Sequence, residues 1–496
     1  MTQLLQNVFL LSISLMFLPF TTCLVFLSLI RQIVFPRDTL RKRVRQSLSF
    51  HPKTILVTGV STTHGLQIAR IFYETGHEVI GADLERFRVP AVGRMSKALK
   101  VFYRLERPTG DTEAATYIKI LTDVVLREKV DLWINCASIS TAVEDAQARE
   151  VIERKTACRC IQWNVETTSI LNHTESLMQF TRNVGLPTPE TYEVSSRDAV
   201  HRILHEGKRE KKTYIITNTE IDASPRPIGQ TTLPRRTLGQ TYQYVSDLSI
   251  SKKTPWLLQR YISGEEYVAF AAVVNGVVKV FVACPLSKSA THYVALPSHM
   301  GLYKAMMSFT QEFAFHLGSS CSGHLTIYFL VEERATKQGL EQTVLPFKGC
   351  SRAQAALINL LGREGQLNLT KAYLSALEPS IKTPTLPDIT DPATIVAADN
   401  AVLHGCYWVG QDLLFLVLCP FWHLVSLKLD LKAFFKGVVL FFEHVFFEKE
   451  ATYELWDPWP FWWLYHVYWP SRFLMMIWRQ MTGTGKRTSA LVNSGK

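Results

Sequence analysis

The sequence predicts an α/β protein that is attached to a membrane near its N-terminus. Three observations support this prediction. Strand-like and helix-like segments alternate between residues 53 and 135, which is typical of a parallel sheet covered by helices. Two apolar β-type runs meet at Asn275-Gly276, the pair that a two-residue hairpin turn prefers. The first 30 residues contain no charged side chain.

Composition is that of a globular protein with a membrane-associated part. Of 496 residues, 47% are hydrophobic and 20% are charged, and mean hydropathy is +0.05. The net charge is +11, and six basic residues stand against one acidic residue between Arg31 and Arg45. A basic segment beside an apolar helix favours anionic lipid headgroups, so membrane lipids are an expected partner. The middle of the chain has no basic stripe interleaved with aromatic residues, so no nucleic acid partner is expected.

Val8 to Ile30 is long enough to cross a bilayer, which needs about 20 apolar residues. A signal peptide carries its positive charges before the apolar run, whereas here they follow it. The positive-inside rule therefore predicts a single span with the body in the cytosol, and we expect the endoplasmic reticulum membrane. A buried core helix is the alternative.

The soluble part begins with alternating elements. The first strand is Thr54–Thr58, and after a loop and a helix the second is Glu78–Asp83; a helix at 111–128 and a strand at Val130–Asn135 repeat the pattern. Such βαβ units predict a parallel sheet with right-handed crossovers, as in a Rossmann-like domain.

A short-chain NAD(P)-dependent reductase is a lower alternative for this region. Gly59 and Gly65 loosely suggest a glycine fingerprint, and Asp83 could meet a ribose. However, the full Gly-x-Gly-x-x-Gly pattern is missing, and no Tyr-x-x-x-Lys pair occurs in the chain.

The next part reads as mixed α and β structure. The expected elements are a helix at 168–182, a helix at 196–206, a strand at 213–218, a loop at 222–238, strands at 268–274, 277–283, 323–330 and 344–347, a helical stretch at 309–315, and a helix at 353–361.

The C-terminal part is rich in tryptophan. Eight of eleven tryptophans lie beyond residue 400, and Leu413–Leu427 is an uncharged run of fifteen residues. That run is short for a span, so it fits an interfacial or re-entrant helix, and tryptophans are enriched at headgroup level. A Trp-rich core or dimer surface is the alternative. Gly483–Lys496 is expected to be a disordered basic tail.

The nine cysteines are odd in number and scattered. Paired Cys-x-x-Cys units are missing, so no metal site is predicted. This usage fits a reducing compartment.

Residues 255–352 carry a resemblance to a family. Gln259-Arg260-Tyr261-Ile262-Ser263-Gly264-Glu265-Glu266 resembles the Gln-Glu-x-Ile-x-Gly-x-Glu hinge of ATP-grasp enzymes. The hairpin follows, then a strand, then a segment that ends at Arg352 where the family has Glu-x-Asn-x-Arg. With its flanks, the chain resembles membrane-anchored mycosporine-type ATP-grasp ligases and ATP-grasp enzymes of fungal secondary-metabolite clusters, over roughly residues 50 to 480.

The resemblance implies an ATP-dependent ligase that joins an amino acid or amine to a small acid-like acceptor through an acyl-phosphate-type intermediate. ATP and Mg²⁺ would be its cofactors, and a homodimer or other pathway enzymes could be partners besides the small-molecule substrate. The implied site comprises Arg352 and Lys348 as catalytic cations and Gln259, Glu266, Thr174 and Thr217 as cofactor-binding residues.

The chain departs from the family where phosphate and metal are held. Thr174 and Thr217 replace two lysines, Tyr328 replaces the strand acid, and Lys348 and Cys350 replace the Glu-x-Asn pair. An alignment shifted by a residue or two would bring Glu332 or Glu333 to a metal position. A catalytically degenerate ATP-grasp protein, acting as membrane-bound scaffold or small-molecule binder, is therefore the alternative to the ligase.

The predicted organisation has six parts. They are a transmembrane anchor with a basic segment (1–50), a Rossmann-like pre-ATP-grasp domain (51–165), an ATP-grasp domain (166–378), a linker (379–400), a Trp-rich membrane-associated helical region (401–482) and a basic tail (483–496).

Overall fold

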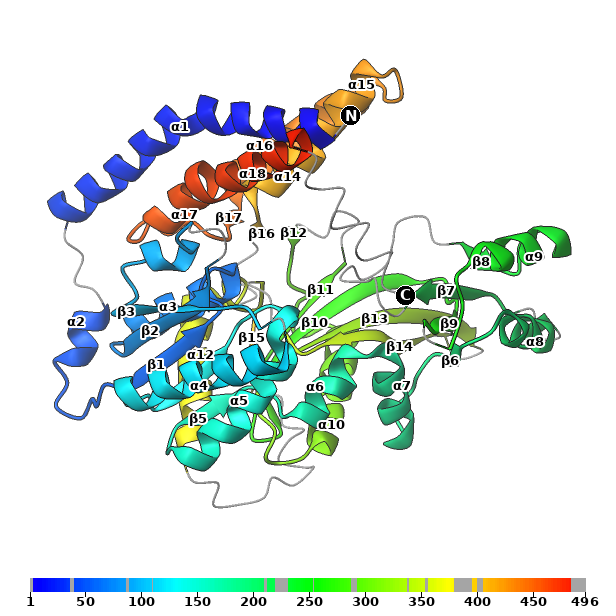
Figure 1. The fold of residues 1–496 in the computed structure, drawn as a ribbon, viewed down its shortest axis with the longest axis horizontal. Helices are drawn as coiled ribbons and strands as arrows, with labels where there is room; N and C mark the ends of the chain where they lie inside the picture. Colours follow the sequence, from blue (N-terminus) through cyan, green and yellow to red (C-terminus); the bar gives the residue numbers. More distant parts are fainter. Residues whose placement is uncertain are drawn as a thin grey trace.

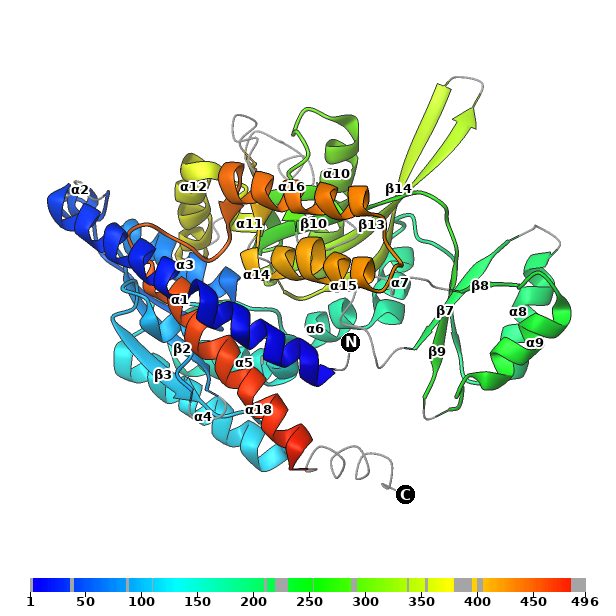
Figure 2. The same ribbon diagram turned by 90° about the horizontal axis from the view of Figure 1, so that it is seen from above.

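The structure is a computed structural model that describes most of the chain. The described residues are 3–35, 40–85, 89–108, 110–208, 212–218, 231–252, 254–286, 292–336, 339–352, 356–378, 395–398 and 405–482. Figures 1 and 2 show a parallel sheet with helices, a long antiparallel sheet beside it, a small lobe that stands off at one side, and a layer of helices above the body.

The N-terminal domain is built on a five-stranded sheet whose pairs are all parallel, as predicted. Its order is β3-β2-β1-β4-β5. The strands are β1 (Thr54–Thr58), β2 (Glu78–Leu84), β3 (Val101–Leu105), β4 (Leu132–Asn135) and β5 (Arg159–Ile161), and the helices are α3 (Thr63–Glu74), α4 (Asp111–Glu128) and α5 (Ala142–Lys155). The strand order reverses direction between β1 and β4. A crevice is expected outside the carboxyl ends of strands at such a point.

A second sheet has the order β14-β13-β10-β11-β15. Its strands are β10 (Glu265–Val274), β11 (Val277–Pro285), β13 (Gly323–Thr336), β14 (Gly339–Cys350) and β15 (Val396–Ala397). The hairpin prediction is confirmed, because Asn275 and Gly276 both have positive φ, 52° and 75°, between β10 and β11.

Alternate residues of β10 bury the two faces of this sheet. Val268, Phe270 and Ala272 belong to a core shared with the N-terminal domain and with α11 (Ala356–Asn359) and α12 (Gly362–Leu374). Ala269 and Ala271 belong to a core with α7 (Thr174–Asn183) and α10 (Gly301–Leu317). Because both faces are covered, the sheet is fixed against the N-terminal domain.

The small lobe is an antiparallel sheet of order β6-β9-β7-β8 with two helices. Its elements are β6 (Thr191–Val194), α8 (Arg197–Lys208), β7 (Tyr214–Asn218), β8 (Thr232–Leu233), α9 (Leu238–Asp247) and β9 (Trp256–Arg260). It has its own core, which includes Val200, Tyr214 and Leu258. Residues 261–264 join β9 to β10, so the hinge-like segment connects the two sheets.

The helical layer combines both ends of the chain (Figure 1). It contains α1 (Gln3–Val34), α14 (Val409–Asp412) continued by a π-helical turn and α15 (Cys419–Val425), α16 (Leu431–Phe447), and α17 (Trp459–Trp463) continued by a second π-helical turn and α18 (Trp469–Met481). A small sheet, β12 (His292–Tyr293), β16 (Cys406–Tyr407) and β17 (Lys449–Glu450), connects the layer to the body.

Among the described residues one helix, within α1 over Asn7–Val34, is long and apolar enough to cross a membrane. Helix α1 presents polar side chains at intervals of seven residues to the C-terminal segment. Ser14 donates to the carbonyl of Tyr465 at 2.8 Å, and Ser28 bonds to the hydroxyl of Tyr453 at 2.7 Å. Thr21 lies between them and bonds to His466 Nε2 at 2.6 Å. The helix is therefore docked along its length.

Several element boundaries differ from the sequence predictions. The helix predicted at 168–182 is two helices, α6 (Val165–Asn172) and α7, because His173 adopts an extended conformation. The strand predicted at 344–347 extends over Gly339–Cys350. Most of the loop predicted at 222–238, most of the linker and the basic tail lie outside the described residues, although 396–397 pair with β11.

A buried ion pair joins the layer to the N-terminal domain. Arg70 of α3 and Asp457 are 2% and 0% exposed, and Arg70 Nε lies 2.9 Å from the carboxylate. The guanidinium also donates to the carbonyls of Thr452 and Asp457, at 2.7 Å each. Ser96 and the backbone of Lys97 donate to the same carboxylate. Burial of the two charges is tolerated because nearly every donor and acceptor has a partner.

We expect Asp457→Ala to destabilise the protein by about 3–5 kcal/mol, because it leaves Arg70 charged and buried without its partner. The double change of Arg70→Met and Asp457→Leu should cost much less. Urea unfolding of the full-length protein in detergent, followed by circular dichroism, would measure both.

Glu190→Ala serves as the control, since Glu190 is 34% exposed in its ion pair with Lys212. Equal losses for Asp457→Ala and Glu190→Ala would contradict a special role of the buried pair.

Candidate functional site

The carboxyl ends of β1 and β4 meet closely at the switch point of the parallel sheet. Gly59, with φ of 72°, directly follows β1, and a Cβ there would lie 2.3 Å from the carbonyl oxygen of Cys136 after β4. The turn after β1 is thus packed directly on the segment after β4. The carboxylate of Asp83 is also used within the protein, because it accepts hydrogen bonds from the backbone amides of Ser61 at 2.6 Å and Leu84 at 2.7 Å. These contacts do not favour the dinucleotide alternative.

A cleft lies on the other side of the segment after β4. It is a small cleft with a volume of about 20 Å³, open in part to solvent, and is lined by Asn135, Cys136, Ala137, Ser138, Ala142, Gln162, Ser351 and Arg352. Six of these residues come from the N-terminal domain, and two, Ser351 and Arg352, directly follow β14. The cleft therefore brings the predicted Arg352 to the place where the strand order predicts a ligand.

Hydrogen bonds fix both walls of the cleft. Asn135 accepts the hydroxyl of Thr58 at 2.8 Å and the amide of Ala137 at 2.9 Å, and it donates to the side-chain oxygen of Gln162 at 2.7 Å. On the opposite wall, the backbone and hydroxyl of Ser351 both donate to Asn172 Oδ1. These bonds hold the side chains of both walls in place.

Arg352 is the charged group of the cleft. Its carbonyl accepts the hydroxyl of Thr326 at 2.6 Å, and its Nε donates to the sulfur of Cys350 at 3.3 Å. Within the part of the chain that the structure describes, no carboxylate lies within 4.0 Å of its guanidinium nitrogens. A guanidinium beside neutral amide and hydroxyl groups suits a carboxylate or phosphate, which it can bind with two parallel hydrogen bonds.

The other predicted site residues are spread over two sheets and helix α7. Gln259 in β9 donates to Thr191 at 3.2 Å, and Thr217 in β7 pairs with Leu257. Glu266 pairs with Leu330, and Thr174 begins α7. Lys348 lies opposite Tyr328 in the register of β13 and β14. Only Arg352 of the six predicted residues lines the cleft.

The register of β13 and β14 allows a test of Mg²⁺ at the position that the resemblance implies. The two facing positions hold a phenol, Tyr328, and an ammonium, Lys348. Burial raises the pKa of Tyr328 to about 12, so the phenol stays protonated. Mg²⁺ prefers hard anionic oxygen ligands, and these two side chains do not supply them.

A shifted alignment does not supply a free carboxylate at Glu332. Glu332 Oε1 lies 4.0 Å from Arg260 Nη2, so the acid of the strand is paired with the basic residue of the hinge. The side chain of Glu333 lies outside the described residues. Tyr328, Lys348 and the paired Glu332 therefore do not fit the implied magnesium site.

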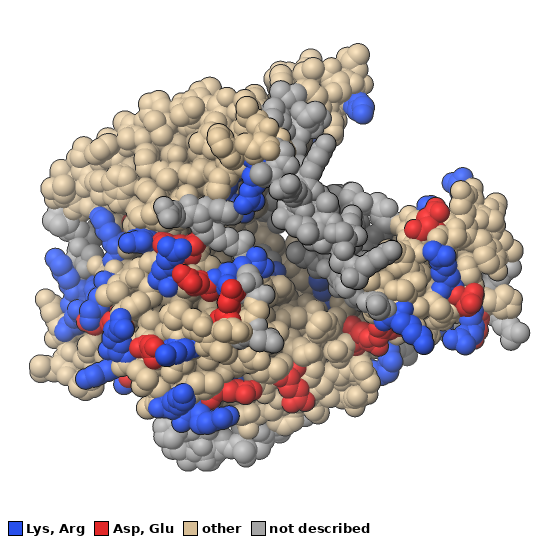
Figure 3. All heavy atoms as spheres, viewed as in Figure 1, with Lys and Arg blue, Asp and Glu red and all other residues tan. Residues whose placement is uncertain are grey.

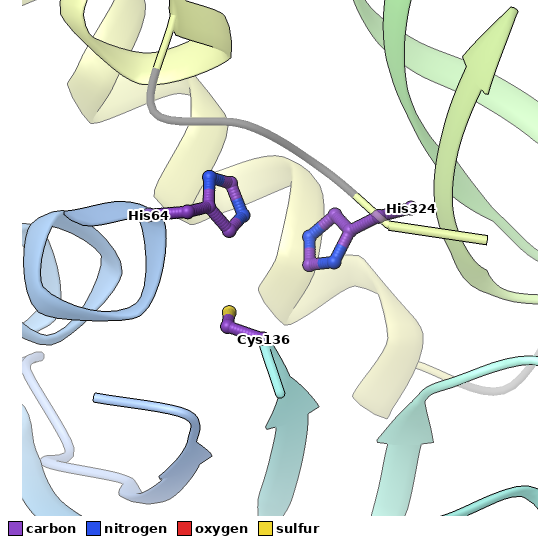
Figure 4. A group of neighbouring side chains, drawn as sticks. All are labelled: His64, Cys136 and His324. Atoms are coloured by element: carbon purple, nitrogen blue, oxygen red, sulfur yellow. The ribbon is translucent and has the colours of Figure 1, made fainter. Parts of the chain in front are cut away.

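A second group next to the cleft was not predicted from the sequence. His64 of α3, Cys136 directly after β4 and His324 of β13 are all buried and point toward one another (Figure 4). Their positions are too far apart in the sequence for a motif. The only available sequence signal was Asn135-Cys136 at the end of a predicted strand.

The comparisons with known proteins give the following. No protein-family model matches the chain, and no curated protein sequence matches it. Similar solved structures include an L-amino acid ligase from Bacillus licheniformis, with 13% identity, 67% of this chain and 75% of that chain covered, and a TM-score of 0.45. The N5-carboxyaminoimidazole ribonucleotide synthetase purK in its ADP complex has 13% identity, coverage of 62% and 72%, and a TM-score of 0.44.

A third similar structure is the biotin carboxylase domain of Hydrogenobacter thermophilus 2-oxoglutarate carboxylase, in complex with MgADP, ADP and bicarbonate. It has 13% identity, coverage of 68% and 72%, and a TM-score of 0.47. Likenesses at this level carry no conclusion about the activity of this chain.

Asp145, at the start of α5 behind the cleft wall, is a buried acid. It is 0% exposed, and it accepts the hydroxyls of Tyr117 at 2.6 Å and Thr141 at 2.9 Å. Burial raises its pKa to about 6 despite these hydrogen bonds. The folded protein therefore binds a proton here more tightly than the unfolded chain does, between about pH 4 and pH 6.

We expect this group to lower stability as the pH rises from about 4 to about 6, by roughly 3 kcal/mol in total for a shift of about two units. Asp145→Asn should remove that part of the pH dependence, as measured by denaturant unfolding at several pH values. Asp123→Asn, at an exposed position of α4, is the control. Parallel pH profiles for the wild type and Asp145→Asn would contradict the raised pKa.

Proposed function

We propose that this protein is a membrane-associated protein of ATP-grasp type that binds an anionic small molecule in the cleft at Arg352. The observation that carries the proposal is the position of Arg352. The residue follows β14 by two positions, and it lines a cleft of neutral polar groups together with residues that follow β4. A carboxylate is the ligand group that this arrangement fits best.

The function that the geometry favours is binding with little or no ligase turnover. Lys348 and Arg352 bring positive charge to the end of β14, where the family would hold a metal ion. The guanidinium of Arg352 can meet phosphate oxygens directly, whereas a Mg²⁺ ion beside Lys348 would be repelled. A nucleotide, if bound, would therefore bind weakly or independently of metal. Such a protein would be a catalytically degenerate ATP-grasp protein that binds a small molecule.

An ATP-dependent ligase for an amino acid or amine and a small acid-like acceptor, in secondary-metabolite biosynthesis, is the second candidate. The hinge favours it. A Cβ at Gly264 would lie 2.1 Å from the carbonyl oxygen of Val331, so the segment before β10 requires glycine to pass β13. Gln259 and Glu266 flank this segment, as the resemblance requires.

The helical layer supports membrane association. Large apolar side chains are exposed on all of its long helices, for example Phe20 on α1 (66%), Phe446 on α16 (74%) and Trp478 on α18 (69%). In Figure 3 the surface of this layer is almost without charged side chains, whereas the body below it carries both signs.

The single span with a cytosolic body stays a prediction. The bonds that hold α1 along residues 14–32 against residues 453–466 support a different arrangement, in which α1 lies with the rest of the layer on one side of the membrane. We therefore extend the proposal to a layer that enters one leaflet from the cytosolic side.

Calorimetric titration of the full-length protein in detergent would separate the two functions. We expect ATP to bind weakly, with no more than a small change on adding Mg²⁺, and Arg352→Ala to abolish the binding. Lys279→Ala, a change on β11, is the control for loss of a surface charge. Micromolar binding that depends strongly on Mg²⁺ would favour the ligase and contradict the degenerate site.

Membrane association would be measured by flotation with lipid vesicles and by protease protection of an N-terminal tag in sealed microsomes. We expect the protein to float, and Phe442→Glu with Phe446→Glu to weaken flotation because both side chains are exposed on α16. The tag should be digested from the side that bears the body. Protection of the tag while the body is digested would instead support the single span.

A further inference from the structure

The buried group of His64, Cys136 and His324 has the composition of a site for a soft divalent cation. The three residues are 4%, 8% and 2% exposed, and one potential ligand atom from each lies within 4.8 Å of the other two. Figure 4 shows the two rings and the sulfur directed at a common space. Imidazole and thiolate ligands select zinc over magnesium or calcium.

The geometry of the two rings fits a shared metal ion. The rings of His64 and His324 are nearly perpendicular, at 87°, with centroids 4.9 Å apart. Two imidazoles on one tetrahedral Zn²⁺, with Zn–N bonds of about 2.0–2.1 Å, place their centroids about 5 Å apart. The observed separation therefore requires little movement of either ring.

The hydrogen bonds of His324 define its tautomer. Its Nδ1 lies 3.1 Å from the carbonyl oxygen of Asn135, and a carbonyl can only accept, so Nδ1 carries the proton. Its Nε2 is then the atom with a lone pair, and the hydroxyl of Tyr373 lies 2.7 Å from it. Metal-binding histidines typically donate their second ring N–H to a carbonyl or carboxylate in this way.

Burial sets the protonation states of His324 and Cys136. Burial lowers the pKa of His324 to about 4, so the ring is neutral. Burial raises the pKa of the Cys136 thiol, so without a cation it stays protonated. Binding of a divalent cation would replace that proton: one Zn–S bond forms, and one proton leaves to solvent.

We propose that His64, Cys136 and His324 bind one Zn²⁺ ion. The fourth position falls to the Tyr373 hydroxyl oxygen, or to a water molecule that displaces it. The ion would join α3 and β4 of the N-terminal domain to β13 of the second sheet, and α12 through Tyr373. It would lie directly behind Cys136, a residue of the cleft wall.

A second histidine group in the chain lacks this geometry. The rings of His292 and His444 are stacked, with centroids 4.3 Å apart and planes at 9°. A metal ion lies close to the plane of an imidazole that binds it, so two parallel, stacked rings cannot share one ion. Each ring is instead paired with a carboxylate, His292 with Glu448 at 2.5 Å and His444 with Asp412 at 2.6 Å. This group provides a control.

The test uses the full-length protein in detergent, stripped with a chelator and then incubated with Zn²⁺ or Co²⁺. Elemental analysis after desalting should give one zinc per chain. The cobalt form should show intense visible bands of a tetrahedral site and a near-ultraviolet thiolate-to-cobalt band. Absence of bound metal in protein that is folded by circular dichroism would overturn the proposal.

Variants assign the ligands. Cys136→Ser and His324→Gln should each weaken zinc affinity at least tenfold in competition with a chelating dye, whereas Cys160→Ser and His292→Gln should leave it unchanged. Cys160 is a matched control because it is a buried cysteine, 2% exposed, in the same sheet. Equal affinity of Cys136→Ser and Cys160→Ser would overturn the assignment.

Because Cys136→Ser could fail to fold, a measurement on the wild type accompanies the variants. Zinc should slow alkylation of Cys136 at least tenfold, as read by mass spectrometry of the peptide, and should leave the rate at exposed Cys23 unchanged. Equal protection of both cysteines, or of neither, would count against the site.

Discussion

Helix α3, through the buried guanidinium of Arg70, attaches the helical layer to the N-terminal domain. Arg70 lies where the N-terminal sheet, the residues after β17 and the segment before α17 meet, and it satisfies Asp457 and two carbonyls at once. One turn earlier, Gln67 donates to the carbonyl of Ala451 at 2.8 Å. The same helix therefore carries the contacts that attach the helical layer, and its first turn carries His64 toward β13. Since the layer is bound through fully desolvated polar groups, it cannot slide over the body without leaving a charge unpaired.

This attachment has consequences for the cleft. The layer covers one side of the N-terminal domain, while the second sheet covers another, so the carboxyl ends of β1 and β4 are enclosed from two directions. The turn after β1 is closed by its contact with Cys136, which leaves the side facing Arg352 as the place for a ligand. In that cleft the electrostatics favour an anion, because one cation stands among neutral groups. At the end of β14 they disfavour Mg²⁺, because Lys348 and a protonated phenol occupy the facing positions.

Local patterns were sufficient to predict much of the fold. The alternation of strand-like and helix-like segments predicted the parallel sheet. The pair Asn275-Gly276 predicted the hairpin, because these two residue types readily adopt positive φ at consecutive positions. The break at His173 was missed because helical periodicity continues across it. The docking of α1 was also missed. Ser14, Thr21 and Ser28 are weakly polar in an apolar run, and their spacing of seven gains meaning only when Tyr453 and His466 are placed beside them.

The residues around the cleft also differ in how far the sequence alone could indicate them. Arg352 was a candidate because it belongs to a short segment that resembles a family motif, and its role stays a prediction. The residues opposite it in the cleft come from the N-terminal domain, and their position is set by the packing of two sheets. The histidine and cysteine group is the extreme case, since His64, Cys136 and His324 are spread over three distant segments. What joins them is the segment after β4, which is held by Gly59 on one side and by the bond from His324 to Asn135 on the other. A cation bound to Cys136 would hold this segment at a third point. The position of the cleft wall that faces Arg352 would then depend on the metal site as well as on the sheet.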